Sequence, residues 1–239
     1  MSLITVIGRG HSGTRAISHT LYASGVFMGK LLNRAGDKMP PQEMYNACKV
    51  IAKRVKWDGG FSWDFTDLHT GEIDAEWDRL VESYLADVLN DKSLSKGWKL
   101  PETTLTYPWI LRKFPEAKYI HWIRDPRDSI MSEHRTDDLS DFDIPYPKTE
   151  DIRERRAISW LYQYQLMKAT PTPENMITVR FEDFVLNQEE TLQRLEDFLS
   201  IPLARIIVRK DPIGRWKTDT DKHNFDFFDE AMAEQGYEK

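Results

Sequence analysis

A turn near the N-terminus combines the groups that an oxyanion needs. It runs from Gly8 to Arg15, directly after the β-branched run Leu3–Ile7 and before a stretch of helical spacing. Backbone N–H groups at the positive end of a helix bind phosphate or sulfate, and hydroxyl and guanidinium groups strengthen such a site. The alternative is a tight turn without a ligand. The residues that we expect to contact an anion are Arg9, Gly10, His11, Ser12, Gly13, Thr14 and Arg15.

Two further segments hold basic and hydroxyl side chains. Arg124 follows an apolar run and Ser132 comes eight residues later, so a guanidinium fork and a hydroxyl could converge on one phosphate. A basic, glycine-bearing segment, 209–217, follows near the C-terminus. Taken singly, Arg124 could pair with a carboxylate and the basic segment could be a solvated turn. Together the two segments favour an anion site that includes Arg124, Ser132, Arg209, Lys210, Gly214 and Trp216.

The composition describes one globular domain over residues 1–239. The chain is 40% hydrophobic, and its formal charge of −6 gives no reason to expect nucleic acid or an anionic membrane as partner. Cys48 is the single cysteine, so neither an intrachain disulfide nor a cysteine-based metal site can form. No ligand cluster of recognisable spacing predicts a metal. Because the chain has no signal-peptide pattern and no apolar run long enough to span a membrane, we expect a soluble, cytoplasmic protein.

Alternating strand and helix patterns position these groups. The first motif segment lies between a strand and a helix, and Pro126 would stand at the first position of a helix from about Arg127. Asn187 with Glu190 resembles a capping box. We therefore expect an α/β fold of three layers, with a mainly parallel central sheet and helices on both faces. The expected strands are 3–7, 117–123 and 176–181, and the expected helices are 14–24, 127 onward, 151–168 and 187 onward.

Two segments look like additions to this scaffold. The first, 31–95, is expected on the acceptor side of the site. Its aromatic residues either belong to the core or line an acceptor pocket; they are Trp57, Phe61, Trp63, Phe65 and Trp77. The second, 136–149, carries four aspartates and two prolines and is expected to be a mobile acidic loop, either solvated surface or a lid.

The three motif segments resemble, in order and placement, the signature regions of the sulfotransferases that use 3′-phosphoadenosine 5′-phosphosulfate (PAPS). Ser12-Gly13-Thr14 resembles their 5′-phosphosulfate loop, and 124–132 resembles their 3′-phosphate motif. Segment 209–217 resembles the loop that closes over the 3′-phosphate. The resemblance spans residues 3–30 and 96–218, and it implies the P-loop-like sulfotransferase fold.

Three positions depart from the family pattern. His11 stands where lysine or arginine is common, so Arg9, Arg15 or a protonated His11 would supply that charge. Ala16 replaces an aromatic residue after the loop. Phe181 replaces a tyrosine near the base, where it could stack on adenine but could not donate a hydrogen bond.

The resemblance implies in-line transfer of a sulfuryl group from PAPS to a hydroxyl or amine of a small or medium-sized acceptor, without a metal. Such a reaction depends on positioning, charge stabilisation and a general base. Glu102 falls where the cytosolic members have a catalytic histidine, although it could instead cap a helix. Glu43 and His11 are the competing candidates. Two other functions stay open: a P-loop-type small-molecule kinase, and a non-catalytic protein that keeps the nucleotide site.

Overall fold

Four parallel strands form the central sheet of the computed structural model, which describes residues 1–237. The strand order is β4-β1-β5-β6, so β1 lies between two partners. In the register, Ile4 is opposite both Gly97 and Lys118. The strands are β1 (Ser2–Ile7), β4 (Ser95–Lys99), β5 (Lys118–Ile123) and β6 (Met176–Arg180). The expected parallel sheet is confirmed.

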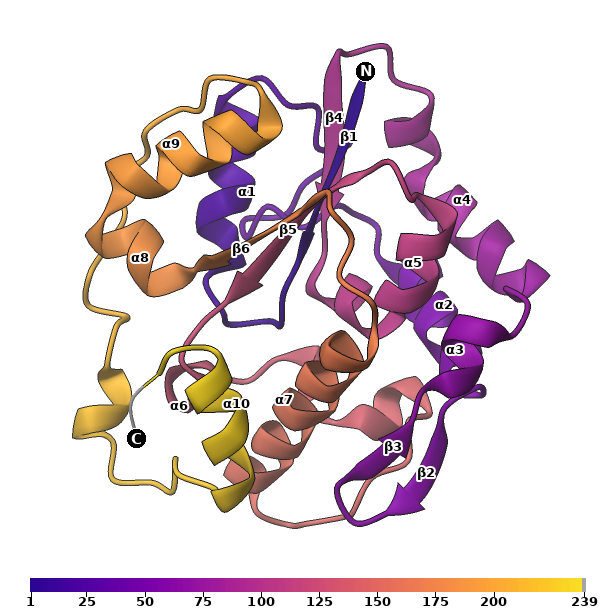
Figure 1. Ribbon diagram of the computed structural model, residues 1–239, viewed down its shortest axis with the longest axis vertical. Coiled ribbons are helices and arrows are strands. Elements are labelled where there is room, and N and C mark those ends of the chain that lie inside the picture. The colour runs from indigo at the N-terminus through magenta and orange to yellow at the C-terminus, as the bar shows by residue number, and fades with distance from the viewer. Residues whose placement is uncertain (238–239) are drawn as a thin grey trace.

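Helices cover both faces of the sheet, as Figure 1 shows. One face carries α1 (Thr14–Ala23), α8 (Phe181–Leu186) and α9 (Gln188–Leu199). The other carries α2 (Gln42–Ala52), α4 (Ala75–Leu89), α5 (Tyr107–Lys113) and α7 (Ile152–Ala169). Each face has its own cluster of buried apolar side chains. The three-layer α/β architecture is thus confirmed.

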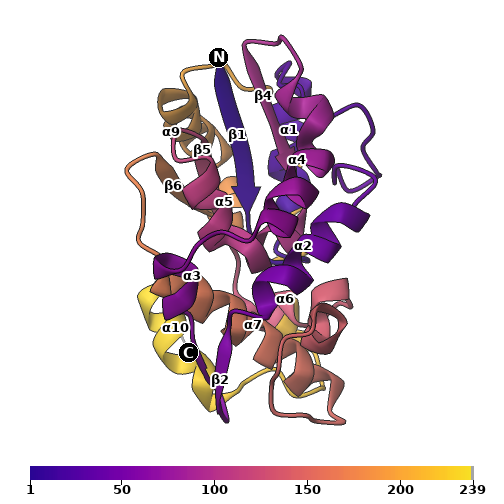
Figure 2. The same ribbon diagram turned by 90° about the vertical axis from the view of Figure 1, so that its right-hand side faces the viewer.

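Short elements complete the chain. Seen from two directions, α10 lies beside α7 at the end of the molecule away from the N-terminus (Figures 1 and 2). A hairpin, β2 (Lys56–Gly59) with β3 (Ser62–Asp64), projects near the same end. The remaining helices are α3 (Thr66–Thr70), α6 (Pro126–Ser129) and α10 (Asp229–Glu234). The 3-10 helices are η1 (Pro101–Thr106), η2 (Arg135–Asp137), η3 (Leu139–Phe142), η4 (Arg215–Thr218) and η5 (Asp226–Phe228).

The helix expected from Arg127 onward is only one turn long, so the prediction that Ser132 lies two turns into it is wrong. Pro126 does stand at the start of α6. The carbonyl groups that a longer helix would use are bonded elsewhere. Arg9 Nη1 donates to Ser129 O at 3.0 Å, and Arg156 Nη1 donates to the next two carbonyls at 3.3 and 3.2 Å. These arginines turn the chain away from the helix axis and bring Ser132 to the sheet edge.

Two local expectations need correction. The helix after Asn187 begins there, but the Asn187 side chain makes no capping hydrogen bond. The edge strand β4 was not predicted, because Ser-Lys-Gly-Trp-Lys has little strand character. Gly97 is needed in it, since a Cβ there would lie 2.1 Å from Ile4 O on the neighbouring strand.

The two segments expected as additions are packed against the rest of the molecule. In 31–95, Trp63, Phe65 and Trp77 are buried in the core, whereas Trp57 and Phe61 are partly exposed. In 136–149, four apolar side chains are buried: Leu139, Phe142, Ile144 and Tyr146. An acceptor role for 31–95 and mobility of 136–149 stay predictions. No helix within residues 1–237 is long and apolar enough to cross a membrane.

Candidate functional site

A cleft of about 670 Å³ opens where β1 and β5 end, next to the start of α1. In α/β sheets, ligands bind outside the carboxyl ends of the strands. All three motif segments contribute to the cleft. The predicted residues that line it are Gly10, His11, Gly13, Thr14, Arg15, Arg124, Ser132, Phe181 and Arg209.

The loop between β1 and α1 presents backbone donors to this cleft. Gly13 is the N-cap of α1 and has a left-handed conformation, with φ at 82°. No side chain caps the first turn, and of its N–H groups that of Ala16 donates to Gly13 O at 3.0 Å, so those of Thr14 and Arg15 are the candidates for contact with an anion. Phe181 packs directly on Gly13, because a Cβ at this position would lie 2.3 Å from the ring. Glycine is therefore required here for both conformation and space.

Arg124 ties the three motif segments together. Its Nη1 donates to His11 O at 2.8 Å, and its Nη2 donates to Pro212 O in the C-terminal segment. The guanidinium also lies 4.9 Å from the centre of the Phe181 ring. Its Nε is buried and has no partner. Its Nη2 also lies 3.5 Å from Asp128 Oδ2, so the pairing of Arg124 with a carboxylate is present. Arg124 thus fixes the cleft wall through its Nη atoms.

Asp128 holds the backbone of the C-terminal segment, 209–217, by two hydrogen bonds. Its carboxylate accepts from Gly214 N at 2.7 Å and from Trp216 N at 3.1 Å. The Arg127 guanidinium lies 3.8 Å from the Trp216 ring centre. Gly214 and Trp216 therefore lie outside the cleft lining, and so does the exposed Lys210.

The cations near the loop differ from those that the sequence suggested. Arg9 is buried, pairs with Asp137 and does not line the cleft. His11 donates from Nε2 to Glu133 O, and burial lowers its pKa, so its ring is neutral at pH 7. Arg15 is exposed at the cleft wall. Two further cations line the cleft without having been singled out for it, namely Lys99 and Arg215.

Ser12 is also absent from the cleft lining. It is buried, and its carbonyl accepts from Trp122 Nε1 at 2.8 Å, which anchors the loop to β5. The predicted loop residues that do line the cleft are Gly10, His11, Gly13, Thr14 and Arg15.

Glu102 lies in η1, behind the cleft wall, and is only 2% exposed. Burial raises the pKa of its carboxyl group to about 7, with the Asp37 charge adding to this and Arg135 and Lys99 opposing it. Its Oε2 has no hydrogen-bond partner. The side chain caps neither η1 nor α5, so the alternative role of Glu102 as a helix cap is not observed. A carboxyl group with this pKa can exchange a proton near neutral pH.

Lys99 and Asp37 form the wall in front of Glu102. Lys99 Nζ pairs with the Asp37 carboxylate and donates to Ala35 O at 2.8 Å. Burial lowers the pKa of Lys99, and the Asp37 charge opposes that shift. Ala35 and Asp37 bring part of segment 31–95 into the cleft. Glu43, in the first turn of α2, does not line it.

His134 is a site residue that the sequence analysis missed. Its Nε2 lies 4.0 Å from Glu102 Oε1, and its ring lines the cleft. The ring also packs on the loop, because a Cβ at Gly10 would lie 2.2 Å from it. The only sequence signal is its place two residues after Ser132, which by itself indicates nothing.

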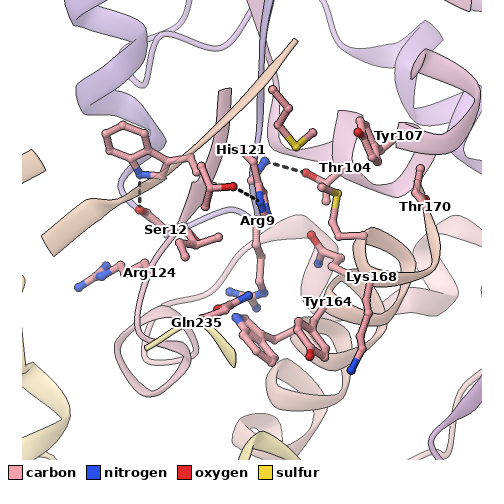
Figure 3. A pocket seen from close by; sticks show the side chains of 18 of the residues that line it. Arg9, Ser12, Thr104, Tyr107, His121, Arg124, Tyr164, Lys168, Thr170 and Gln235 are labelled. Carbon is pink, nitrogen blue, oxygen red and sulfur yellow. Dashed lines mark hydrogen bonds between the residues drawn. The ribbon is translucent and has the colours of Figure 1, made fainter. Parts of the chain in front are cut away.

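A second, smaller cavity of about 220 Å³ lies on the other side of the loop, between β5, β6 and α7 (Figure 3). His121 points into it, and burial lowers the pKa of that ring to about 4. Tyr107 Oη and Gln163 Oε1 line the same space and have no partner. Arg124 borders both cavities. Within residues 1–237, no group of three or more His, Cys, Asp or Glu side chains could hold a metal ion.

The fold resembles that of a solved sulfotransferase. The sulfotransferase domain from the curacin biosynthetic pathway superposes with a TM-score of 0.64 at 16% sequence identity. The alignment covers 99% of this chain and 98% of that domain. The P-loop-like sulfotransferase fold that the sequence resemblance implied is thus confirmed.

Curated relatives are distant in sequence. Protein-tyrosine sulfotransferase 1 of Danio rerio is 23% identical over 206 residues, which cover 84% of this chain and 54% of that protein. A Caenorhabditis elegans protein with the provisional name of a protein-tyrosine sulfotransferase is 24% identical, over 74% of this chain and 69% of that protein. This chain thus spans about half the length of the Danio rerio relative.

The family model described as "Sulfotransferase family" matches residues 4–205, which include the loop, both strands that end at the cleft, and Glu102. The match covers well over half of the chain, and this protein therefore belongs to the sulfotransferase family.

Proposed function

We propose that this protein transfers a sulfuryl group from PAPS to a hydroxyl or amine of a small or medium-sized acceptor. The observation that carries the proposal is the convergence of three distant segments on one cleft at the start of α1. The loop supplies backbone donors, and Arg15, Arg124, Arg209 and Arg215 supply positive charge. A cleft with these donors in an acidic protein suits a ligand with several anionic groups.

The donor set fits PAPS. The first turn of α1 and Thr14 would hold the 5′-phosphosulfate. Arg124 would hold the 3′-phosphate together with Ser132 and Arg209, which line the same cleft. Phe181 would contact the adenine ring. PAPS supplies a sulfuryl group on a phosphate leaving group, so the protein's own task is to position both reactants and to accept the acceptor's proton.

Two neighbouring residues, Lys99 and Glu102, would stabilise charge and take up the proton. Lys99 lies at the cleft wall, where its ammonium group could neutralise charge that develops during transfer. Glu102, whose pKa is about 7, is the group best suited to act as general base. The neutral His11 is a poor substitute for the lysine or arginine of the family, and Arg15 takes over that charge.

The two rival functions differ in what they bind and turn over. A small-molecule kinase would need ATP with a metal ion and a lysine in the loop, which the segment Gly8–Arg15 lacks. A non-catalytic family member would bind the nucleotide without turnover. Neither rival is favoured by a specific feature of the cleft.

Calorimetry with adenosine 3′,5′-bisphosphate (PAP) and adenosine 5′-monophosphate tests the donor assignment. Two charged hydrogen bonds to the 3′-phosphate would make PAP bind about 100- to 10,000-fold more tightly. Arg209→Met should remove part of that difference. Arg205→Met is the matched control, because Arg205 pairs with Glu189 and Glu196 and does not line the cleft. Equal affinities for the two nucleotides would refute the use of PAPS.

A further inference from the structure

The hydrogen bonds around His134 fix which ring nitrogen carries its proton. Thr136 N donates to His134 Nδ1 at 3.2 Å, and Thr136 Oγ1, 3.0 Å from the same nitrogen, is a hydroxyl that can donate to it as well. A backbone N–H can only donate, so Nδ1 accepts and bears no proton. The neutral ring therefore has its proton on Nε2, the nitrogen that faces Glu102. Burial lowers the pKa of His134 to about 3, with Arg9 and His11 adding to the shift, so this neutral form is present at pH 7.

The position of the ring is set from two sides. It packs on Gly10 of the loop, and the segment that follows is held by Asp137, whose carboxylate accepts from His134 N at 2.6 Å. Asp137 in turn pairs with the buried Arg9. The Nε2–H group thus lies at a defined place between the loop and Glu102, and the His134 side chain, which is 19% exposed, lines the cleft.

The distance between His134 Nε2 and Glu102 Oε1 is 4.0 Å, which is too long for a direct hydrogen bond. It suits an oxygen atom between them, about 2.8 Å from each. Such an atom would donate to Glu102 and accept from His134. The same arrangement would give Nε2–H an acceptor, since Glu102 Oε1 itself is too far away to accept from it directly.

We propose that His134 is a catalytic residue that holds the attacking oxygen of the acceptor together with Glu102. This rests on the proposed function. The acceptor hydroxyl donates its proton to Glu102 and accepts a hydrogen bond from His134 Nε2 through one lone pair. The other lone pair attacks sulfur. As the new oxygen–sulfur bond forms, the bond from sulfur to the 5′-phosphate oxygen breaks, its electron pair stays on that phosphate, and the hydroxyl proton passes to Glu102.

The arrangement distinguishes hydroxyl from amine acceptors. A hydroxyl oxygen has two lone pairs, so it can accept from His134 and still attack. A neutral amine has a single lone pair, and a hydrogen bond from Nε2–H would occupy the electrons needed for attack. His134 therefore selects alcohols, phenols or water over amines as the nucleophile.

Two substitutions at this position separate the donor from the bulk of the ring. Gln can place an amide N–H near the position of Nε2, whereas the shorter Asn reaches only the position of Nδ1. The reaction of PAPS with water needs no identified acceptor, so release of [35S]sulfate under single-turnover conditions is the measurement. We expect His134→Gln to stay within a few-fold of wild type and His134→Asn to lose about 10- to 100-fold.

PAP affinity, measured in parallel, keeps failure of the proposal apart from failure of the proposed function. Both variants should bind PAP as wild type does, which also shows that they fold. Equal sulfate release by wild type, His134→Gln and His134→Asn would overturn the role of His134. A wild-type protein that binds PAP but releases no sulfate above the uncatalysed rate would overturn it too. A wild-type protein that does not bind PAP would refute the proposed function instead.

A competition between matched acceptors tests the selectivity. Wild-type protein with PAPS and equal concentrations of phenol and aniline should yield phenyl sulfate, identified by mass spectrometry, with aniline product at least about tenfold lower. N-sulfated aniline at a comparable rate would contradict the two-lone-pair arrangement.

Discussion

At the scale of single residues, burial assigns chemistry that residue type leaves open. Glu102 and His11 are both titratable, and burial moves their pKa values in opposite directions. The pKa of the Glu102 carboxyl group rises to about 7, whereas that of the His11 ring falls. Burial always disfavours the charged form, which is the anion for glutamate and the cation for histidine. The carboxyl group thereby becomes the better proton acceptor of the two.

Replacement of Glu102 should show the loss of a base without the loss of the nucleotide. Glu102→Gln keeps the size of the side chain but cannot accept the proton, so turnover should fall by about 10²- to 10⁴-fold. PAP affinity should stay nearly unchanged. Neither carboxylate lines the cleft itself, but Glu102 lies 4.0 Å from the cleft-lining His134, whereas Glu43 lies in the first turn of α2. Glu43→Gln is therefore the matched control, and it should have a much smaller effect. Near-full activity of Glu102→Gln would place the base elsewhere, with Glu43 as the leading candidate.

The pH dependence should follow the same carboxyl group. The charged or titratable groups around it are Asp37, Lys99, Arg135, His134, Tyr45, Tyr84 and Cys48. Cys48, Tyr45 and Tyr84 have raised pKa values and stay protonated, and His134 stays neutral, so none of these four titrates near 7. We expect the single-turnover rate to fall about tenfold per pH unit below pH 7, a limb that Glu102→Gln should lack.

The contribution of Glu102 to the stability of the fold should change with pH in the opposite direction from the rate. The folded pKa of Glu102 lies above its ordinary value of 4.5. Its contribution to stability is therefore complete below that ordinary value and is lost as pH rises through about 7. Unfolding by denaturant should show that Glu102→Gln gains stability relative to wild type between pH 5 and pH 8. A constant difference across this range would contradict the raised pKa.

At the scale of elements, the start of α1 and the start of α8 depend on each other. Gly13 and Phe181 are in van der Waals contact across the cleft, so the ring of α8 helps to fix the loop that precedes α1. Arg124 closes the arrangement, because its guanidinium contacts the Phe181 ring and bonds to the loop carbonyl of His11. The two helices lie on the same face of the sheet, and the loop lies at their common end (Figure 1).

A matched pair of glycines tests this contact. Gly13 and Gly25 have φ angles of 82° and 83°, and a Cβ at Gly25 would meet nothing within 4 Å. Gly25→Ala should cost only the left-handed strain, about 1–2 kcal/mol in the free energy of unfolding. Gly13→Ala should cost more, because its Cβ would overlap Phe181, and only Gly13→Ala should weaken PAP binding, by at least about tenfold. Equal losses of stability together with unchanged PAP affinity would rule out the contact.

At the scale of the whole molecule, the cleft exists only because distant segments meet at one sheet edge. Some residues from each of the segments 10–16, 35–37, 99–101, 124–134 and 206–215 line it. These segments come from both faces of the sheet and bring their positive groups to one cleft. The chain can therefore hold an anion there although its net charge is negative. The positive groups gather at one end, while the carboxylates are spread over the surface or paired.

The donors of this cleft are N–H, hydroxyl and cationic groups of the protein itself, so turnover should not need a metal ion. Sulfuryl transfer from PAPS should keep its rate within about twofold in excess EDTA, as expected when positioning and protein dipoles stabilise the transition state. The measurement is initial rate with and without chelator, with added Mg²⁺ as the control. Loss of turnover on chelation, restored by Mg²⁺, would favour a kinase-like reaction.

The sequence by itself determined the local structure around the site. The strand of Leu3–Ile7, the turn with Gly10 and Gly13, and the helix after it follow from neighbours in the chain, and all are found in the structure. Strands 117–123 and 176–181 and the parallel α/β architecture were predictable for the same reason: apolar period and glycine placement are local properties.

Tertiary structure alone decided which of these side chains face the cleft and which protonation state each of them has. Arg9 turns away from the cleft because Asp137 pairs with it, although the two are far apart in the sequence. Ser132 leaves the helix because two arginines bond the carbonyl groups before it. His134 reaches Glu102 only because its ring packs on Gly10. Direction, burial and pKa depend on contacts across the fold, and no local pattern in the chain encodes them.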